Sequence, residues 1–318
     1  MEQPVTLNKN GQINIVLNNE KKTVKITKVS KSLEKQQEMI HSKHEPLKRI
    51  EEEMSALVGM EEMKKIIKEI YAWIYINKVR EEHGLLTGGQ VLHMLFKGNP
   101  GTGKTTVARL IGKLLKEMNA LSKGHLIEAE RADLVGEYIG HTAQKTRDLI
   151  KKAMGGILFV DEAYSLARGG EKDFGKEAID TLVKNMEDKQ NDFILILAGY
   201  AREMDQFLNL NPGLRSRFPL VIEFPDYTVD QLMEIAQKMM KERQYVFSKE
   251  AEWKLREQLQ IIKYNRSPQP HVFSNGRYIR NVIEKAVRTQ AMRLLLNDSY
   301  EKRDLEMILS DDLVFVDL

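Results

Sequence analysis

A glycine-rich segment at 96–106, FKGNPGTGKTT, carries residue types that suit the binding of phosphate groups. From Gly98 to Thr105 it fits the pattern G-x-x-x-x-G-K-[S/T] in full, with an apolar run before it and an amphipathic run after it. Glycines let backbone N–H groups turn inward at φ values that a Cβ opposes, and the following helix directs its positive end at the same anion. The segment therefore predicts a cradle for the triphosphate of a nucleotide.

Two side chains of this cradle have specific expected roles. We expect Lys104 to reach the β- and γ-phosphates and the hydroxyl of Thr105 to ligate Mg²⁺. A glycine-rich turn that holds a lysine by chance is the alternative, which the flanking strand and helix patterns disfavour. The residues expected around the phosphates are Gly98, Asn99, Pro100, Gly101, Thr102, Gly103, Lys104, Thr105 and Thr106.

A second segment, GGILFVDEAYS at 155–165, ends an apolar run in two carboxylates. Such a run predicts a buried strand, and open parallel sheets bind ligands at the carboxyl ends of their strands. Asp161 would hold the Mg²⁺, and Glu162 would act as a general base that polarises a water for attack on the γ-phosphate. An ordinary acidic turn is the alternative. Because nucleotide switches and kinases seldom need the second acid, Glu162 favours hydrolysis.

The elements that must position these residues follow an alternating pattern. Short apolar runs predict strands buried on both faces. Amphipathic stretches such as 107–118 lie between them and predict helices. This alternation indicates an α/β fold, with a mostly parallel sheet between two layers of helices. The expected strands are at 91–96, 125–129, 157–160, 193–198 and 220–224.

The pattern changes toward both ends of the chain. Residues 1–45 are mostly polar, apart from a possible short strand at 13–19, and we interpret them as a weakly ordered N-terminal extension. Residues 46–225 form the expected nucleotide-binding domain, which opens with a helical stretch that Gly84 should end. Residues 226–318 are interpreted as a smaller domain of three or four helices, with a possible last strand at LVFV (313–316).

Composition disfavours several classes of protein. The 49 basic and 46 acidic side chains leave a net charge of +3, which makes no electrostatic case for nucleic acid or an acidic membrane surface. Cysteine is absent, which excludes disulfides and thiolate metal sites. No apolar stretch approaches the ~20 residues that span a bilayer, and no secretory signal pattern opens the chain. We therefore expect a cytoplasmic protein that binds neither nucleic acid nor membrane.

These segments together resemble the AAA+ ATPases, and most closely their CbbX-type branch, which includes rubisco activases of the red type. The resemblance implies a P-loop NTPase sheet sandwiched by helices, a small α-helical lid domain after it, and ATP with Mg²⁺ as ligands. It rests on LVGMEEMK (57–64), GNPGTGKTT (98–106), LVGEYIGHT (134–142), ILFVDEAYSL (157–166), LAGY (197–200), NPGLRSRFP (211–219) and SNGRYIRNVIEKA (274–286).

The resemblance implies roles for residues outside the cradle. Val58 and Gly59 would lie against the adenine. Tyr138 would project from a pore loop into the channel of a ring and grip a polypeptide, which suits a large aromatic side chain between two glycines. Local packing of Tyr138 is the alternative. At the end of the fourth strand, where AAA+ proteins often carry Asn or Thr to position the attacking water, this chain has Tyr200, so either that side chain or a backbone group would act there.

Four arginines complete the implied site. Arg217, with Arg215 in reserve, resembles the arginine finger that meets the γ-phosphate bound by a neighbouring subunit. Arg277 best fits the sensor 2 position at the start of a lid helix, and Arg280 follows one turn later. Any of the four could instead be a surface residue that pairs with an acid.

The resemblance implies an ATP-driven remodeller that acts as a homo-oligomeric ring, expected to be a hexamer, on an unidentified protein client. A closer likeness to members of the branch that act in sporulation implies bacterial spore maturation. The alternatives are an ATP-dependent assembly scaffold or switch that translocates nothing, and a rubisco-activase-like remodeller. A DNA-acting loader is disfavoured by the near-neutral charge, and a small-molecule kinase would leave the lid and the paired arginines without a role.

Overall fold

The structure is a computed structural model of the chain, whose contacts divide it into two units, 1–48 and 49–318. All of the expected N-terminal extension except its last two residues, including the possible strand at 13–19, lies outside the described residues. The structure describes residues 44–55, 57–88, 91–138, 140–168, 173–210, 212–264, 273–296 and 299–315.

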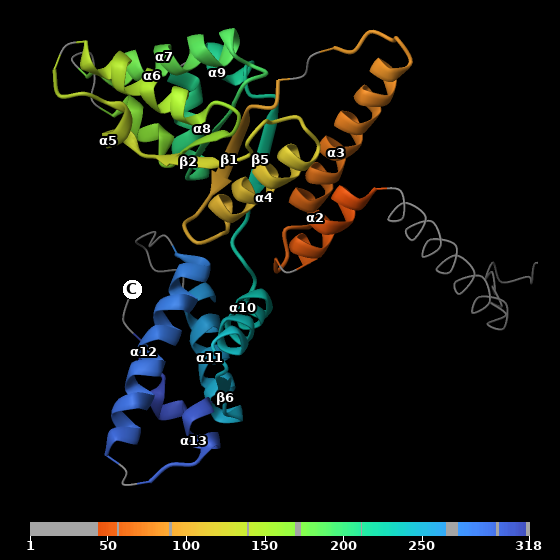
Figure 1. Cartoon of the computed structure of the whole chain (residues 1–318). Coiled ribbons are helices and arrows are strands. Elements are labelled where there is room, and N and C mark those ends of the chain that lie inside the picture. Colours follow the sequence, from red (N-terminus) through yellow and green to blue (C-terminus); the bar gives the residue numbers. More distant parts are fainter. Residues whose placement is uncertain are drawn as a thin grey trace, which may run out of the picture. The chain divides into compact units, whose positions relative to one another are not determined.

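Five parallel strands form the central sheet, in the order β2-β3-β4-β1-β5 (Figure 1). Each strand overlaps one of the predicted apolar runs, so the prediction of a parallel α/β sheet is confirmed. β3 and β4 are buried along their whole length, as continuous apolar sequences require. The strands are β1 (Met94–Gly98), β2 (Leu126–Ala129), β3 (Ile157–Val160), β4 (Ile194–Gly199) and β5 (Leu220–Phe224).

Helices cover the sheet (Figure 1). Some predicted site residues lie at the ends of these helices, such as Lys104 at the start of one and Arg215 at the end of another. The helix α4 starts at Lys104, within the predicted cradle, and buries one apolar face, which includes Val107, Ile111 and Leu114. The helices of this part are α2 (Glu45–Ser55), α3 (Glu61–Glu82), α4 (Lys104–Glu117), α5 (Arg131–Leu134), α6 (His141–Ala153), α7 (Gly175–Asp188), α8 (Ala201–Leu210) and α9 (Pro212–Arg215), with the 3₁₀-helix η2 (Ala163–Ala167).

The two faces of the sheet have separate apolar surroundings. Leu158 and Val160 of β3 belong to the same buried cluster as Leu195 and Leu197 of β4, together with apolar residues of α6, α7 and α8. On the opposite face the rings of Phe96 and Phe159 meet edge to face, with their centroids 6.3 Å apart. The alternation of side chains along each strand therefore gives the sheet two cores and explains its continuous apolar sequences.

The helical stretch before β1 is divided into two helices, which the sequence did not predict. Gly59 and Met60 adopt φ values of +67° and +63° between α2 and α3, and this left-handed backbone cannot continue a right-handed helix. The predicted end at Gly84 is confirmed: it has φ +69° and follows the last residues of α3.

The chain after β5 forms a mostly helical body with its own apolar core, which includes Leu232, Leu255 and Ile283. The expected group of three or four helices is present. None of the helices in the described part of the chain combines the length and the apolar character needed to cross a bilayer. The elements are α10 (Val229–Glu242), β6 (Val246–Phe247), α11 (Lys249–Tyr264), α12 (Asn275–Leu295), α13 (Lys302–Glu306), β7 (Met307–Ile308) and the 3₁₀-helix η3 (Ser310–Asp312).

The strands of this body differ from the prediction. β6 and β7 pair in parallel over two residues each, whereas residues 313–315 of the expected last strand are not a strand and residue 316 lies outside the described residues. The backbone oxygens of Ser310 and Leu313 accept hydrogen bonds from Nζ of Lys254, at 2.8 and 3.0 Å. These carbonyls are therefore bound to a side chain of α11 instead of to a neighbouring strand.

A buried histidine just before β1 connects this strand to β4 and to the helix α7. His93 is 1% exposed, and its Nδ1 accepts a hydrogen bond from the backbone N–H of Leu195 at 3.0 Å. Its Nε2 lies 3.0 Å from the backbone oxygen of Met186 and must therefore carry the proton and donate it. This arrangement requires the neutral ring, and burial lowers the pKa of His93.

We expect the free energy of unfolding to fall when the pH drops below the unfolded-state histidine pKa of about 6.5. The folded state holds His93 neutral while the unfolded state takes up a proton, so stabilisation present above that value is lost as the pH falls toward the folded pKa. Urea unfolding at pH 7.5 and pH 5.5 would measure the change. His93→Gln should be less stable at both pH values but lose less stability between them. Equal losses in the two proteins would contradict the assignment.

Candidate active site

The predicted cradle joins the carboxyl end of β1 to the first turn of α4. Gly101 and Gly103 have φ values of +69° and +94°, in the left-handed region that favours glycine. A Cβ on Gly98 would stand 2.7 Å from the Cβ of Phe224, and one on Gly101 would stand 2.7 Å from the backbone nitrogen of Arg277. The glycines of the motif are thus required both by the backbone conformation and by close neighbours.

Lys104 is buried at the start of α4 and lies back over the cradle. Its Nζ donates to the backbone oxygens of Gly98 and Asn99 at 2.8 and 2.9 Å. Burial, the largest cause, lowers the pKa of Lys104, and the nearby negative charge of Asp161 opposes that effect. The hydroxyl of the buried Thr102 donates to the backbone oxygen of Asn99 at 2.7 Å, which fixes the shape of the loop.

The predicted acids follow β3 directly. The backbone N–H of Glu162 donates to Oδ1 of Asp161 at 2.9 Å, which orients that carboxylate. Glu162 itself has φ +46°, a conformation that costs a non-glycine residue about 1–3 kcal/mol and is found mainly where a function requires it. The strained backbone presents the Glu162 side chain as an exposed group beside Asp161.

A cleft of about 670 Å³ brings most of the predicted residues together, and this volume is in the range of small-molecule sites. Tyr138, Arg215 and Arg217 are not among the described residues that line it. Gly98, Asn99 and Thr102 of the cradle are also outside the lining, as is Gly59, which precedes the lining residue Met60. The predicted residues on the cleft wall are Val58, Pro100, Gly101, Gly103, Lys104, Thr105, Thr106, Asp161, Glu162, Arg277 and Arg280.

The cleft also has an apolar wall, of which the sequence analysis identified only the segment at 57–64. Met60, Tyr227 and Met239 contribute to it from three separate segments. The hydroxyl of Tyr227 donates to the backbone oxygen of Thr102 at 3.1 Å, and burial raises the pKa of this phenol to about 12. The one signal in the sequence for Tyr227 was its position shortly after the fifth strand, in FPDYT. A flat base could lie against this wall while its phosphates reach the cradle.

Two tyrosines lie beside Glu162. Tyr200 follows β4 and lines the cleft, and its ring stacks on that of Tyr164 with the centroids 5.7 Å apart. Gly199 permits this packing, because a Cβ there would stand 2.7 Å from Cδ1 of Tyr164. Burial first, and then the negative charge of Glu162, raise the pKa of both phenols. Both hydroxyls therefore remain protonated at neutral pH and can donate hydrogen bonds.

The remaining predicted residues lie on exposed or partly exposed segments. Tyr138 follows α5 and is 65% exposed, and its ring meets that of His141 edge to face with the centroids 5.4 Å apart. Nε of Arg217 donates to Oε1 of Glu187 at 2.5 Å, whereas Arg215, at the end of α9, is exposed. An ion pair as exposed as that of Arg217 contributes at most about 1 kcal/mol, so another anion could displace Glu187.

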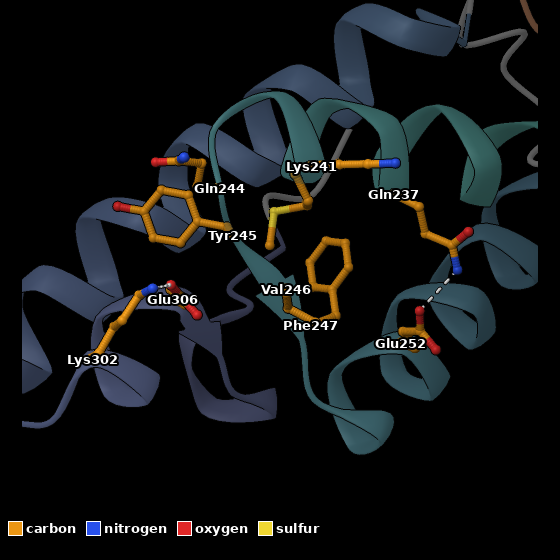
Figure 2. Close-up of a pocket in the computed structure, with 10 residues that line it drawn as sticks. Gln237, Lys241, Gln244, Tyr245, Val246, Phe247, Glu252, Lys302 and Glu306 are labelled. Carbon is orange, nitrogen blue, oxygen red and sulfur yellow. Dashed lines mark hydrogen bonds and ion pairs between the residues drawn. The ribbon is translucent and has the colours of Figure 1, made fainter.

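A second hollow, of about 520 Å³, lies within the helical body between α10, β6 and α13 (Figure 2). Two pairs of polar groups meet within its wall: Nζ of Lys302 lies 3.4 Å from Oε1 of Glu306, and Nε2 of Gln237 donates to Oε1 of Glu252 at 2.8 Å. It contains none of the residues predicted to do chemistry. We therefore place the functional site in the cleft at the edge of the sheet.

Comparison with known proteins agrees with this geometry. The profile of the ATPase family associated with various cellular activities (AAA) matches residues 94–226, and that of the AAA lid domain matches residues 228–317. Stage V sporulation protein K of Bacillus subtilis (strain 168) is 68% identical over 313 residues, which cover 98% of this chain and 97% of that protein. The chain belongs to the AAA family of ATPases.

Other relatives of this AAA ATPase confirm the branch that its segments resemble, since they include proteins named CfxQ and CbbX. The chloroplastic ribulose bisphosphate carboxylase/oxygenase activase of Cyanidioschyzon merolae (strain NIES-3377 / 10D) is 44% identical over 261 residues, which cover 81% of this chain and 87% of that one. Among solved structures, the FIGL-1 AAA domain in complex with ADP matches with a TM-score of 0.55 and 19% identity, over 80% of each chain, and so shares the fold.

Proposed function

We propose that this AAA ATPase hydrolyses ATP in a Mg²⁺-dependent reaction and uses the reaction to remodel a protein client. One observation carries the proposal: Lys104, Asp161 and Glu162 line a single cleft together with an apolar wall. The adenine would lie against that wall near Val58 and Gly59. The phosphates would meet the backbone N–H groups of the cradle, the positive end of α4 and the ammonium of Lys104.

The donor set fits Mg²⁺. This ion is usually bound by one or two protein groups together with phosphate oxygens and waters, and the cleft offers the hydroxyl of Thr105 and the carboxylate of Asp161. The nucleotide and waters would supply the other ligands. When bound, the ion would neutralise charge that develops on the phosphate oxygens.

Glu162 is assigned as the general base. Its side chain lies beside Asp161 at the carboxyl edge of the sheet and accepts the proton of the attacking water. The protonated phenol of Tyr200 reaches the cleft from the end of the next strand, so it is the side chain that we assign to orient this water. Arg277 and Arg280 would bind phosphate oxygens from the start of α12.

Glu162→Gln should bind ATP with unchanged affinity but hydrolyse it about 10²–10⁴-fold more slowly, because an amide cannot accept the proton. Phosphate release measures turnover, and the fluorescence of a labelled ATP analogue measures affinity. Lys104→Met is the matched control that should lose binding itself. Turnover by Glu162→Gln at the wild-type rate would show that Glu162 is not the base.

Arg217, with Arg215 in reserve, is proposed as the finger that enters the active site of a neighbouring subunit in a ring, expected to be a hexamer. Neither arginine lines the cleft of its own chain, which agrees with a role in trans. The ion pair of Arg217 with Glu187 would open on assembly.

Arg217→Ala should lower turnover about 10³–10⁵-fold, the range known for arginine fingers. Mixing it with Glu162→Gln should restore part of the activity, because an intact arginine then meets an intact base on the adjoining subunit. The same mixture with Arg215→Ala decides between the two arginines. Absence of any recovery in both mixtures would contradict action in trans.

Tyr138 is proposed to grip the client, since its exposed ring and its position between α5 and α6 suit a pore loop. The near-full-length similarity to stage V sporulation protein K supports spore maturation as the biological setting. Rubisco activation is the second candidate, supported by the weaker similarity to the chloroplastic activase. An assembly scaffold that translocates nothing would need the nucleotide but not this tyrosine.

Expression of this chain in Bacillus subtilis that lacks stage V sporulation protein K tests both points. The wild-type chain should restore heat-resistant spores, whereas Tyr138→Ala should keep its ATPase rate and fail to restore them. Tyr138→Phe is the control that retains the aromatic ring. Full restoration by Tyr138→Ala would favour the scaffold, and failure of the wild-type chain would remove the sporulation role.

A further inference from the structure

The outer side of the phosphate cradle is hydrogen-bonded to the segments around the start of α12. The backbone oxygen of Gly101 accepts from the N–H of Gly276 at 3.1 Å, and that of Pro100 lies 3.4 Å from Nδ2 of Asn275. These carbonyls belong to the loop whose N–H groups would hold the nucleotide. The cradle therefore has one side for the phosphates and another side that is already occupied by protein.

Asn275 is the centre of these contacts. Its side chain is fully buried, and its backbone has φ +45°, in the left-handed region. Oδ1 accepts the backbone N–H of Tyr227 at 3.0 Å, while Nδ2 donates to Oδ1 of Asp226 at 2.7 Å and to the backbone oxygen of Phe273 at 3.1 Å. Each end of the amide has a partner, as a buried amide requires.

Asp226 extends the network back to the cradle. Its carboxylate oxygens also accept hydrogen bonds from Nδ2 of Asn99, at 2.9 and 3.1 Å. One carboxylate thus joins a residue of the cradle to the first residue of α12. We call Asn99, Asp226 and Asn275 the Asn–Asp–Asn bridge.

The bridge fixes the part of α12 that faces the cleft. Arg277 lies two residues after Asn275, and its backbone nitrogen approaches Gly101 so closely that a Cβ there would stand 2.7 Å away. The Arg277 side chain lines the cleft together with Lys104 and Glu162. A small shift at the start of α12 would therefore move the Arg277 guanidinium relative to the phosphates, and hydrogen bonds of this kind depend strongly on distance.

We propose that Asn275 is a positioning residue: through Asp226 it holds the start of α12 against the phosphate cradle and so sets where Arg277 meets the nucleotide. This inference rests on the proposed ATP hydrolysis and adds a residue that contacts neither phosphate nor water. It also gives Asp226 a defined role, because its carboxylate accepts hydrogen bonds from the side-chain amides of both Asn99 and Asn275.

An exchange of side chains tests the bridge. Asn275→Asp places two carboxylates against each other and should lower kcat/KM about tenfold or more, since a part-buried hydrogen bond becomes a repulsion. The double variant Asp226→Asn with Asn275→Asp again has one carboxylate and one amide and should recover part of that loss, because a carboxylate at position 275 still cannot donate to the backbone oxygen of Phe273. Thermal unfolding and circular dichroism check that each variant folds. Asn275→Gly, which tolerates φ +45°, replaces Asn275→Asp if the latter does not fold.

A double-mutant cycle with Arg277→Ala separates positioning from general stabilisation. If Asn275 acts through Arg277, Asn275→Gly should cost little more once Arg277 is absent, for both kcat/KM and the affinity for a fluorescent ATP analogue. Equal, additive losses in the two backgrounds, or wild-type kinetics for Asn275→Gly, would overturn the proposal. If the wild-type chain binds ATP without turnover, the proposed function fails, while the affinity cycle still decides the role of Asn275.

Discussion

The structure depends on a short loop whose glycines have no room for a Cβ. Between β1 and α4 the chain must present N–H groups to an anion, and on its other side it packs against Phe224, Ser274 and the backbone of Arg277. Glycine satisfies both demands, because it adopts positive φ and has no Cβ to meet those neighbours. The positions of β5 and of the start of α12 follow from the same contacts.

The parallel sheet provides the second constraint. Parallel strands end on the same edge, so the residues after β1, β3 and β4 lie close together although they are far apart in sequence. This edge gathers the cradle, the acids at 161–162 and Tyr200. This part of the site is thus a consequence of strand order: the cradle, the acids and Tyr200 each lie just beyond a strand that is fully or almost fully buried.

Sequence reasoning identified the parts of the molecule in which a local sequence pattern is compatible with a single kind of structure. Continuous apolar runs gave the five strands, and the glycine-rich motif gave the cradle. It missed contacts made between ordinary residues of distant segments. Met60, Tyr227 and Met239 form the apolar wall only after folding, and no local spacing marks them. The pairing of β6 with β7 was missed for a related reason, since two residues are too few for a periodic pattern.

The backbone of Glu162 has a consequence for engineering. A backbone φ of +46° has a lower conformational energy for glycine than for glutamate, so Glu162 adopts it against its own backbone preference. Selection for heat-resistant variants often replaces residues whose backbone is strained. At position 162 such a replacement would remove the acid on which turnover depends. At position 162, thermal stability therefore favours glycine, whereas turnover requires glutamate.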